Sequence, residues 1–112
     1  RIVVNLIENA LRHSRPGGRV ELDVEEDGWQ LVLRVSDRGP GVSEADLPHI
    51  FEPFYRGQDG ASGVRPRAGL GLAIARSLAV AEGGTVDYRP RPGGGRIFEL
   101  RLPGERIPVL RG

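Results

Sequence analysis

The 112-residue sequence predicts one α+β domain, a two-layer sandwich in which helices cover one face of a mixed, mostly antiparallel sheet. Two observations favour this class. Helical patterns occur at the start of the chain and over 70–81, and strand patterns occur in adjacent pairs. A doubly wound fold needs strands that alternate singly with helices, and that order is missing.

The first predicted helix runs from the start of the chain to about residue 13. At 3.6 residues per turn, one arc is apolar and the opposite arc is polar. The apolar arc holds Ile2, Val3, Leu6, Ile7, Ala10 and Leu11, and the polar arc holds Asn5, Glu8, Asn9 and Arg12, with His13 at its edge. Because the chain starts inside this helix without a cap, we expect a domain that is N-terminally truncated.

Two strand pairs are predicted. Segments 19–26 and 29–36 alternate apolar with polar residues, as half-buried strands do, and Asp27-Gly28 is a hairpin turn signal. Segments 85–89 and 97–102 form the second pair. Between the pairs, Ser43 is expected to cap a short helix over 44–46, and the helix over 70–81 stops at Gly83-Gly84.

The remaining segments are predicted loops. Residues 56–68 are polar, rich in Gly and Arg and without periodicity, so we expect a functional lid there. The tail, 104–112, is expected to be poorly ordered. No linker or repeat interrupts the chain, so 1–112 is treated as one domain.

Composition excludes several classes of protein. There is no cysteine, which removes disulfides, thiolate nucleophiles and Cys-based zinc sites. Arginine supplies all 16 positive charges, so a P-loop, which needs lysine, is excluded. A net charge of +1 predicts no nucleic-acid surface, and without a long apolar run we expect no membrane contact.

Four segments carry chemistry. Asn5 and Asn9 share a helix face at i and i+4, and a side-chain carbonyl oxygen suits magnesium. A solvated polar face explains the same pattern. Asp37, followed by Arg38-Gly39-Pro40-Gly41, comes directly after a strand, where a carboxylate can accept the amine of adenine. A strand-to-helix turn explains that motif equally well.

The other two segments flank the predicted lid. Gly69-Leu70-Gly71-Leu72 opens a helix, whose free amide hydrogens suit phosphate, although close helix packing also calls for glycine. In Phe51-Glu52-Pro53-Phe54-Tyr55-Arg56, the aromatic rings are expected to anchor the loop in the core. Arg56 is placed to reach a phosphate.

Together, in this order and spacing, the four segments resemble the nucleotide-binding boxes of the histidine-kinase ATP-binding domain, in the wider group that includes gyrase, Hsp90 and MutL. The resemblance runs from Asn5 to Leu72, and Phe98 to Pro103 looks like the closing strand. It implies a Bergerat-type fold with an ATP lid over 56–68. It also implies Mg2+ on Asn9, adenine on Asp37, and an ATP-binding set of Asn5, Asn9, Arg12, His13, Asp37, Gly39, Gly41, Phe54, Arg56, Gly69, Leu70, Gly71 and Leu72.

Two departures from the family pattern bear on activity. Arg67-Ala68 precedes Gly69, where the family often has Gly-Thr. Hydrolysing relatives carry a water-activating Glu where Asn5 stands, which favours transfer to a side chain over hydrolysis. Neither His13 nor His49 fits the phosphoacceptor pattern, so no catalytic residue of that kind is expected in this chain.

The resemblance therefore implies the catalytic domain of a two-component sensor histidine kinase that transfers the ATP γ-phosphate to a histidine on a separate dimerisation domain. Implied partners are ATP, that dimerisation domain and a response regulator receiver domain. The implied location is cytoplasmic, in a membrane-anchored bacterial parent protein. A serine kinase acting on an anti-sigma antagonist and a non-catalytic ATP-sensing module remain alternatives.

Overall fold

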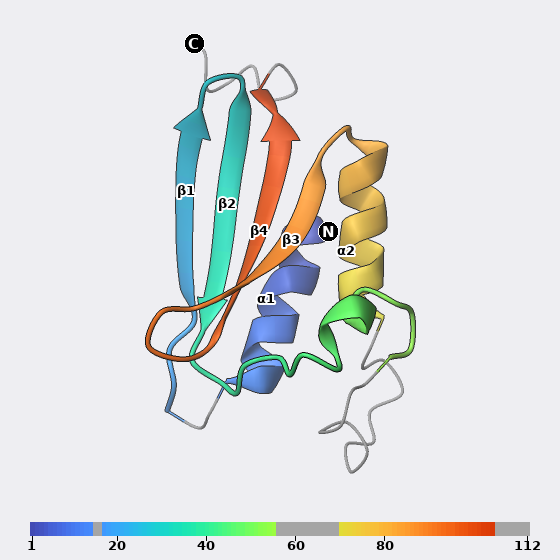
Figure 1. Cartoon of the computed structure of the whole chain (residues 1–112). Helices are drawn as coiled ribbons and strands as arrows, with labels where there is room; N and C mark the ends of the chain where they lie inside the picture. The colour runs from blue at the N-terminus through green and yellow to red at the C-terminus, as the bar shows by residue number, and fades with distance from the viewer. Residues whose placement is uncertain (15–16, 56–69, 105–112) are drawn as a thin grey trace.

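A computed structural model describes residues 1–14, 17–55 and 70–104 (Figure 1). The whole of the predicted lid, 56–68, and the tail after Gly104 lie outside these ranges. In chain order the elements are α1 (Ile2–His13), β1 (Glu21–Asp27), β2 (Gln30–Asp37), the 3-10 turn η1 (Leu47–His49), α2 (Gly71–Ala81), β3 (Thr85–Pro90) and β4 (Arg96–Pro103). Both predicted helices and both strand pairs are confirmed.

The four strands form one sheet in the order β1-β2-β4-β3, and every pairing among the described strands is antiparallel. Val24 of β1 lies opposite Leu33 of β2, and Val35 of β2 lies opposite Phe98 of β4. The predicted hairpin turn is confirmed, with Gly28 at a φ of 62° that favours glycine. The two central strands, β2 and β4, lie far apart in the sequence and pair directly in the sheet.

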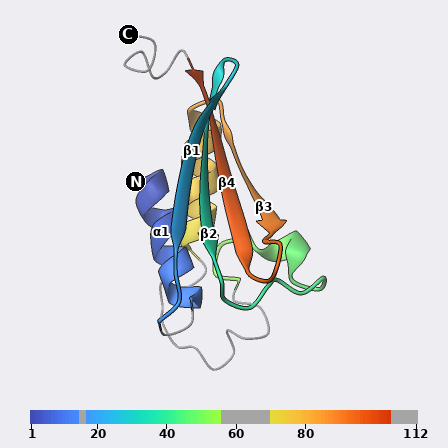
Figure 2. The same ribbon diagram turned by 90° about the vertical axis from the view of Figure 1, so that its left-hand side faces the viewer.

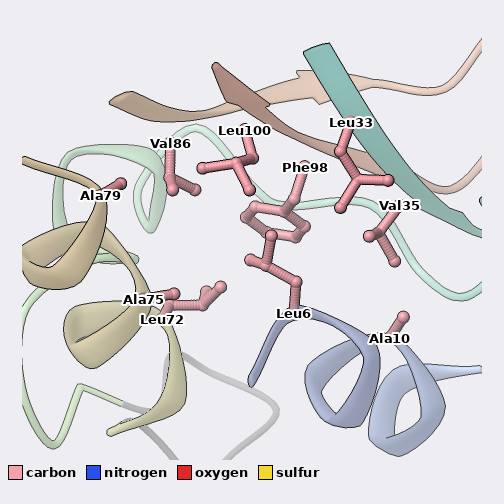
Figure 3. Packing of buried hydrophobic residues seen from close by; sticks show 10 residues of the cluster. All are labelled: Leu6, Ala10, Leu33, Val35, Leu72, Ala75, Ala79, Val86, Phe98 and Leu100. Atoms are coloured by element: carbon pink, nitrogen blue, oxygen red, sulfur yellow. The ribbon is translucent and has the colours of Figure 1, made fainter. Parts of the chain in front are cut away.

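Both helices pack on one face of this sheet. Helix α1 contacts β2 and α2, and α2 contacts β3 and β4, as the two views of Figures 1 and 2 agree. In Figure 3 Leu6 points from α1 toward the Phe98 ring, with Ala75 and Leu72 of α2 beside it. The core cluster consists of Leu6, Ala10, Leu33, Val35, Leu72, Ala75, Ala79, Val86, Phe98 and Leu100. The predicted two-layer sandwich is confirmed.

Strand β1 differs from its prediction as a half-buried strand. Leu22 and Val24 point to the helical side of the sheet but are 53% and 58% exposed. The reason is the placement of the helices, because α1 packs over β2 and reaches no further across the sheet. Alternation identified the strand correctly, but it did not reveal which strands the helices cover.

Three local predictions were also wrong. Residues 44–46 form a turn, stabilised by the Ser43 Oγ, which accepts the Asp46 N–H at 3.3 Å; the helical turn follows at Leu47–His49. Phe51 packs edge-on against Phe98 as expected, but Phe54 is 68% exposed and has a φ of 68°. Gly104, predicted to begin the poorly ordered tail, is buried and donates its N–H to the Trp29 carbonyl.

Candidate nucleotide site

The ends of three secondary-structure elements lie at one end of the molecule. The carboxyl end of β2, the last turn of α1 and the first turn of α2 all lie at the lower end in Figure 1. They carry Asp37, Asn9 and Gly71, respectively, which come from three of the four segments singled out in the sequence. The fold therefore brings together residues from segments that lie far apart in the sequence.

Asp37 is fully buried, at 0% exposure. Its Oδ1 accepts the Gly39 N–H at 2.9 Å. Its Oδ2 accepts the Arg96 Nε–H at 3.0 Å, and the Arg96 Nη2 lies 2.9 Å from the same oxygen as part of the ion pair. The carboxylate is thus held in one orientation by a backbone amide and a guanidinium, and charge-assisted bonds of this kind are the stronger ones in proteins.

Asn9 lies on the other side of the same guanidinium. It is only 4% exposed, whereas the sequence placed it on a polar arc open to solvent. Its Oδ1 accepts the Arg96 Nη2 at 2.8 Å, and its backbone carbonyl lies 3.4 Å from the same nitrogen. Arg96 explains the difference, because a buried amide oxygen needs a donor and β4 supplies one.

Close backbone contacts hold the Asp37 turn against α1 and β4. A Cβ at Gly39 would collide with the carbonyl of His13, and a Cβ at Gly95 would collide with the carbonyl of Asp37. Gly95 also has a φ of 116°. At Gly41 no atom lies within 4 Å of an added Cβ. Gly39 therefore has a packing role in the structure, whereas its role in an adenine pocket stays a prediction.

His13 ends α1 beside this cluster. Its Nδ1 lies 2.9 Å from the Asn9 carbonyl. Burial of the ring, followed by the charge of Arg96, lowers the pKa of His13 below its ordinary value, although the Asn9 carbonyl opposes this effect. Burial likewise lowers the pKa of Arg96, and Asp37 opposes it; an arginine nevertheless stays charged in proteins.

Asn5 faces the start of α2. An added Cβ on Gly71 would lie 3.9 Å from the Asn5 Oδ1 and 3.8 Å from the Arg12 Nη2. The Asn5 Nδ2 is buried and has no hydrogen-bond partner among the residues that the structure describes. No side chain caps α2, and its first turn carries no acidic residue. These donors and the positive end of the helix suit an anionic group.

The remaining predicted site residues are less informative. The Leu72 side chain belongs to the core, which leaves only its backbone for a ligand, and Leu70 is the residue before α2. Arg56 and Gly69 lie outside the described residues. Among those that are described, no three His, Cys, Asp or Glu side chains group together as a metal site.

Residues 1–106 match the family described as histidine kinase-, DNA gyrase B-, and HSP90-like ATPase. The chain belongs to this family. Its α+β fold, and its assignment as a catalytic ATP-binding domain of the sensor histidine kinase type, are confirmed. None of the described helices has the length and apolar character needed to cross a membrane.

Individual relatives of this ATP-binding domain support the assignment. The signal transduction histidine-protein kinase AfsQ2 of Streptomyces coelicolor is 44% identical over 110 residues, covering 96% of this chain and 19% of AfsQ2. The mycobacterial sensor histidine kinase MprB is 32% identical with a TM-score of 0.75, covering 91% of this chain and 69% of that structure. Full-length ShkA in complex with AMPPNP is 35% identical with a TM-score of 0.74, and the match covers 91% of this chain and 20% of the ShkA chain. The chain thus spans about a fifth of the length of AfsQ2.

Sequence reasoning missed Arg96, which joins Asn9 to Asp37. A signal was present, because Arg96 alternates with Phe98, Leu100 and Leu102, and strand alternation puts all four on the same face. An arginine on the apolar face of a strand predicts a buried acidic partner. The predicted strand began at residue 97, and Arg96 was assigned to the turn before it.

Proposed function

We propose that this domain binds Mg-ATP between the end of β2, α1 and the start of α2. Asp37 would receive the adenine amine, Asn9 the magnesium ion, and Asn5, Arg12 and the first turn of α2 the phosphates. His13, Gly39, Gly41, Phe54, Arg56, Gly69 and the backbone of Leu70 and Leu72 would complete the site. The family match supports ATP binding, and the roles of the individual residues are our proposal.

The observation that carries the phosphate assignment is the Asn5 amide. A buried N–H donor without a partner is costly, and native proteins rarely keep one. This donor lies next to Gly71, where the absence of a side chain leaves room between Asn5 and Arg12. A phosphate oxygen would satisfy the Asn5 donor and pair with the Arg12 charge.

The residues also fit a magnesium ion. Asn9 offers a hard oxygen ligand, and magnesium usually takes one or two protein ligands together with phosphate oxygens and water. When bound, the ion neutralises phosphate charge. The chain's own contribution is to present the Asn9 oxygen from α1, where Asn9 is buried and Leu6 and Ala10 anchor the helix in the core.

Within the parent protein, we propose transfer of the ATP γ-phosphate to a histidine on a separate dimerisation domain, followed by exchange with a response regulator. No carboxylate stands at Asn5 to activate water, which favours transfer over hydrolysis. AfsQ2 is a histidine-protein kinase, which supports this activity over a serine kinase or an ATP sensor. We propose a cytoplasmic location in a membrane-anchored bacterial protein.

Calorimetric titration with AMPPNP and magnesium tests the site. We expect Asn9→Ala to weaken binding at least tenfold in magnesium and little in EDTA, and Asp37→Asn to weaken it in both. Asp87→Asn, an exposed substitution on β3, is the matched control. Unchanged affinity in folded Asn9 and Asp37 variants would refute the residue assignments.

Transfer is tested with the full-length parent protein and labelled ATP. A histidine kinase yields an acid-labile phosphoprotein, and a serine kinase yields an acid-stable one. ATP binding without either product would leave the non-catalytic sensing module as the function. Asn9→Ala in the parent should abolish labelling.

A further inference from the structure

Arg96 occupies an unexpected place in the candidate site. It is the first residue of β4, and its side chain is 5% exposed. The guanidinium donates its Nε–H to Asp37 and forms an ion pair with it, and its Nη2 donates to the Asn9 Oδ1. It further lies 5.1 Å from the centre of the Phe98 ring, so the apolar core supports it from one side.

These bonds use the same atoms that a nucleotide would need. The Asn9 Oδ1 cannot hold a guanidinium proton and a divalent cation at full strength, because the two positive groups repel each other. Oδ2 of Asp37 already accepts the Arg96 Nε–H and lies 2.9 Å from Nη2, and Oδ1 accepts the Gly39 N–H. Asp37 has no solvent-exposed surface, so the adenine of ATP reaches its carboxylate only after the groups that cover it move.

We infer that Arg96 is a competitor built into the nucleotide site: its guanidinium holds the Asn9 and Asp37 oxygens, and Mg-ATP binding requires it to release them. The inference rests on the proposed function, because it takes Asn9 and Asp37 as the magnesium and adenine residues. Arg96 thereby sets both the affinity for nucleotide and its dependence on magnesium.

Other charged groups around Arg96 do not provide an alternative partner. Arg12 and His13 approach it from α1; the charge of Arg12 disfavours the guanidinium and that of Arg96 disfavours protonated His13. The Tyr88 hydroxyl faces it from β3. Asp37 is therefore the one carboxylate that balances the Arg96 charge among the described contacts. Binding must therefore break the Asp37–Arg96 ion pair, for which no other carboxylate of the described segments substitutes.

The test compares AMPPNP affinity of the 112-residue chain with that of Arg96→Thr, in magnesium and in EDTA. We expect Arg96→Thr to bind at least tenfold more tightly in magnesium, with a smaller gain in EDTA, where only Asp37 is released. Arg89→Thr is the matched control, since Arg89 lies on β3 of the same hairpin and bonds Glu99 on the opposite face. Its affinity should stay within twofold of the wild type.

A second measurement uses the wild type and does not depend on how well Arg96→Thr folds. In NMR spectra the Arg96 Nε–H signal is assigned by its loss in Arg96→Lys. This signal should shift or disappear as the wild type is saturated with Mg-AMPPNP. A wild type that binds while this signal stays unchanged overturns the inference and leaves the proposed function intact. Equal or weaker binding by folded Arg96→Thr overturns it as well. Binding by neither wild type nor Arg96→Thr refutes both proposals.

Discussion

At the scale of single residues, Asp37 and Arg96 form a fully buried ion pair at 2.9 Å. Desolvation makes such a pair a weak source of net stability, yet removing one partner leaves the other charge buried without compensation. The two residues are therefore far more sensitive to single substitution than their net contribution suggests.

We predict that Asp37→Ala lowers the free energy of unfolding by about 3–5 kcal/mol, because it strands the Arg96 guanidinium. Urea unfolding at pH 7 measures this change. The control is Asp87→Ala: Asp87 is exposed and lies 3.9 Å from Arg76, so its loss should change stability by less than about 1 kcal/mol. Similar losses in both variants would contradict the buried pair. This sensitivity is the reason for using Asp37→Asn in the binding experiment.

Two glycines of the same turn give a matched pair of substitutions. Gly39→Ala places a methyl group against the His13 carbonyl and should cost about 1–3 kcal/mol, because backbone must shift. Gly41→Ala meets open space and should leave stability unchanged or raise it by up to about 1 kcal/mol. Thermal unfolding of the two variants measures the contrast. The prediction fails if Gly41→Ala is the more damaging change.

His13 predicts a pH dependence with a defined sign. Its pKa in the folded chain is below the ordinary value, so between the two values the unfolded chain binds more protons. Stability should therefore rise with pH up to about 6.5 and show no further contribution from His13 above it. Urea unfolding at pH 5.5 and 7.5 measures the slope. His13→Gln should reduce it, and His49, present in both proteins, cancels in the comparison; an unaltered slope would refute the assignment.

At the scale of elements, helix α1 shows what the sequence could and could not provide. The 3.6-residue period identified the helix, and Leu6 and Ala10 are buried as predicted. The buried arc also includes Asn9 and leaves Leu11 60% exposed. Periodicity reports a helix's apolar side, but the partner packed against each position decides burial, and Arg96 lies 87 residues from Asn9 in sequence.

The same limit applies to the site as a whole. Asn9, Asp37 and Gly71 were found because polar or glycine residues at element ends stand out locally. Their connection through Arg96 depends on the pairing of β2 with β4, which places Asp37 opposite Arg96. Strand register across a sheet comes from tertiary packing and turn geometry, so no local pattern contained it.

Strand coverage yields a prediction for two valines that face the helical side. Val24 on β1 is 58% exposed, whereas Val35 on β2 is fully buried. Val24→Thr should therefore change the free energy of unfolding by less than about 0.5 kcal/mol. Val35→Thr should cost about 1–3 kcal/mol, because it buries a hydroxyl in the core. Urea unfolding of both variants measures the difference, and equal costs would show that β1 is covered in solution.

At the scale of the whole molecule, the two faces of the sheet are held by different interactions. The helical face carries the apolar core, with Phe98 at its centre (Figure 3). The opposite face carries ion pairs that converge on Glu99 of β4, which is bonded by Arg34 of β2, Arg89 of β3 and Arg101 of β4. Alternation along β4 puts Phe98 and Glu99 on opposite faces, so one strand is central to both.

Glu99 therefore supports a prediction about acid stability. Burial by itself raises the pKa of Glu99, but the hydrogen bond from Arg34 and the charges of Arg101 and Arg89 outweigh it and hold the pKa below its ordinary value. A carboxylate with a lowered folded pKa contributes stability above its unfolded pKa and loses it as the pH falls through the folded value. We expect Glu99→Gln to lower the free energy of unfolding at pH 7 by about 1.5–3 kcal/mol, the range for hydrogen bonds to charged groups, and to flatten the decline below about pH 4.5. Urea unfolding from pH 3 to pH 7 measures both proteins, and an acid decline of wild-type steepness in Glu99→Gln would show that the arginines on this face stabilise the sheet without their shared carboxylate.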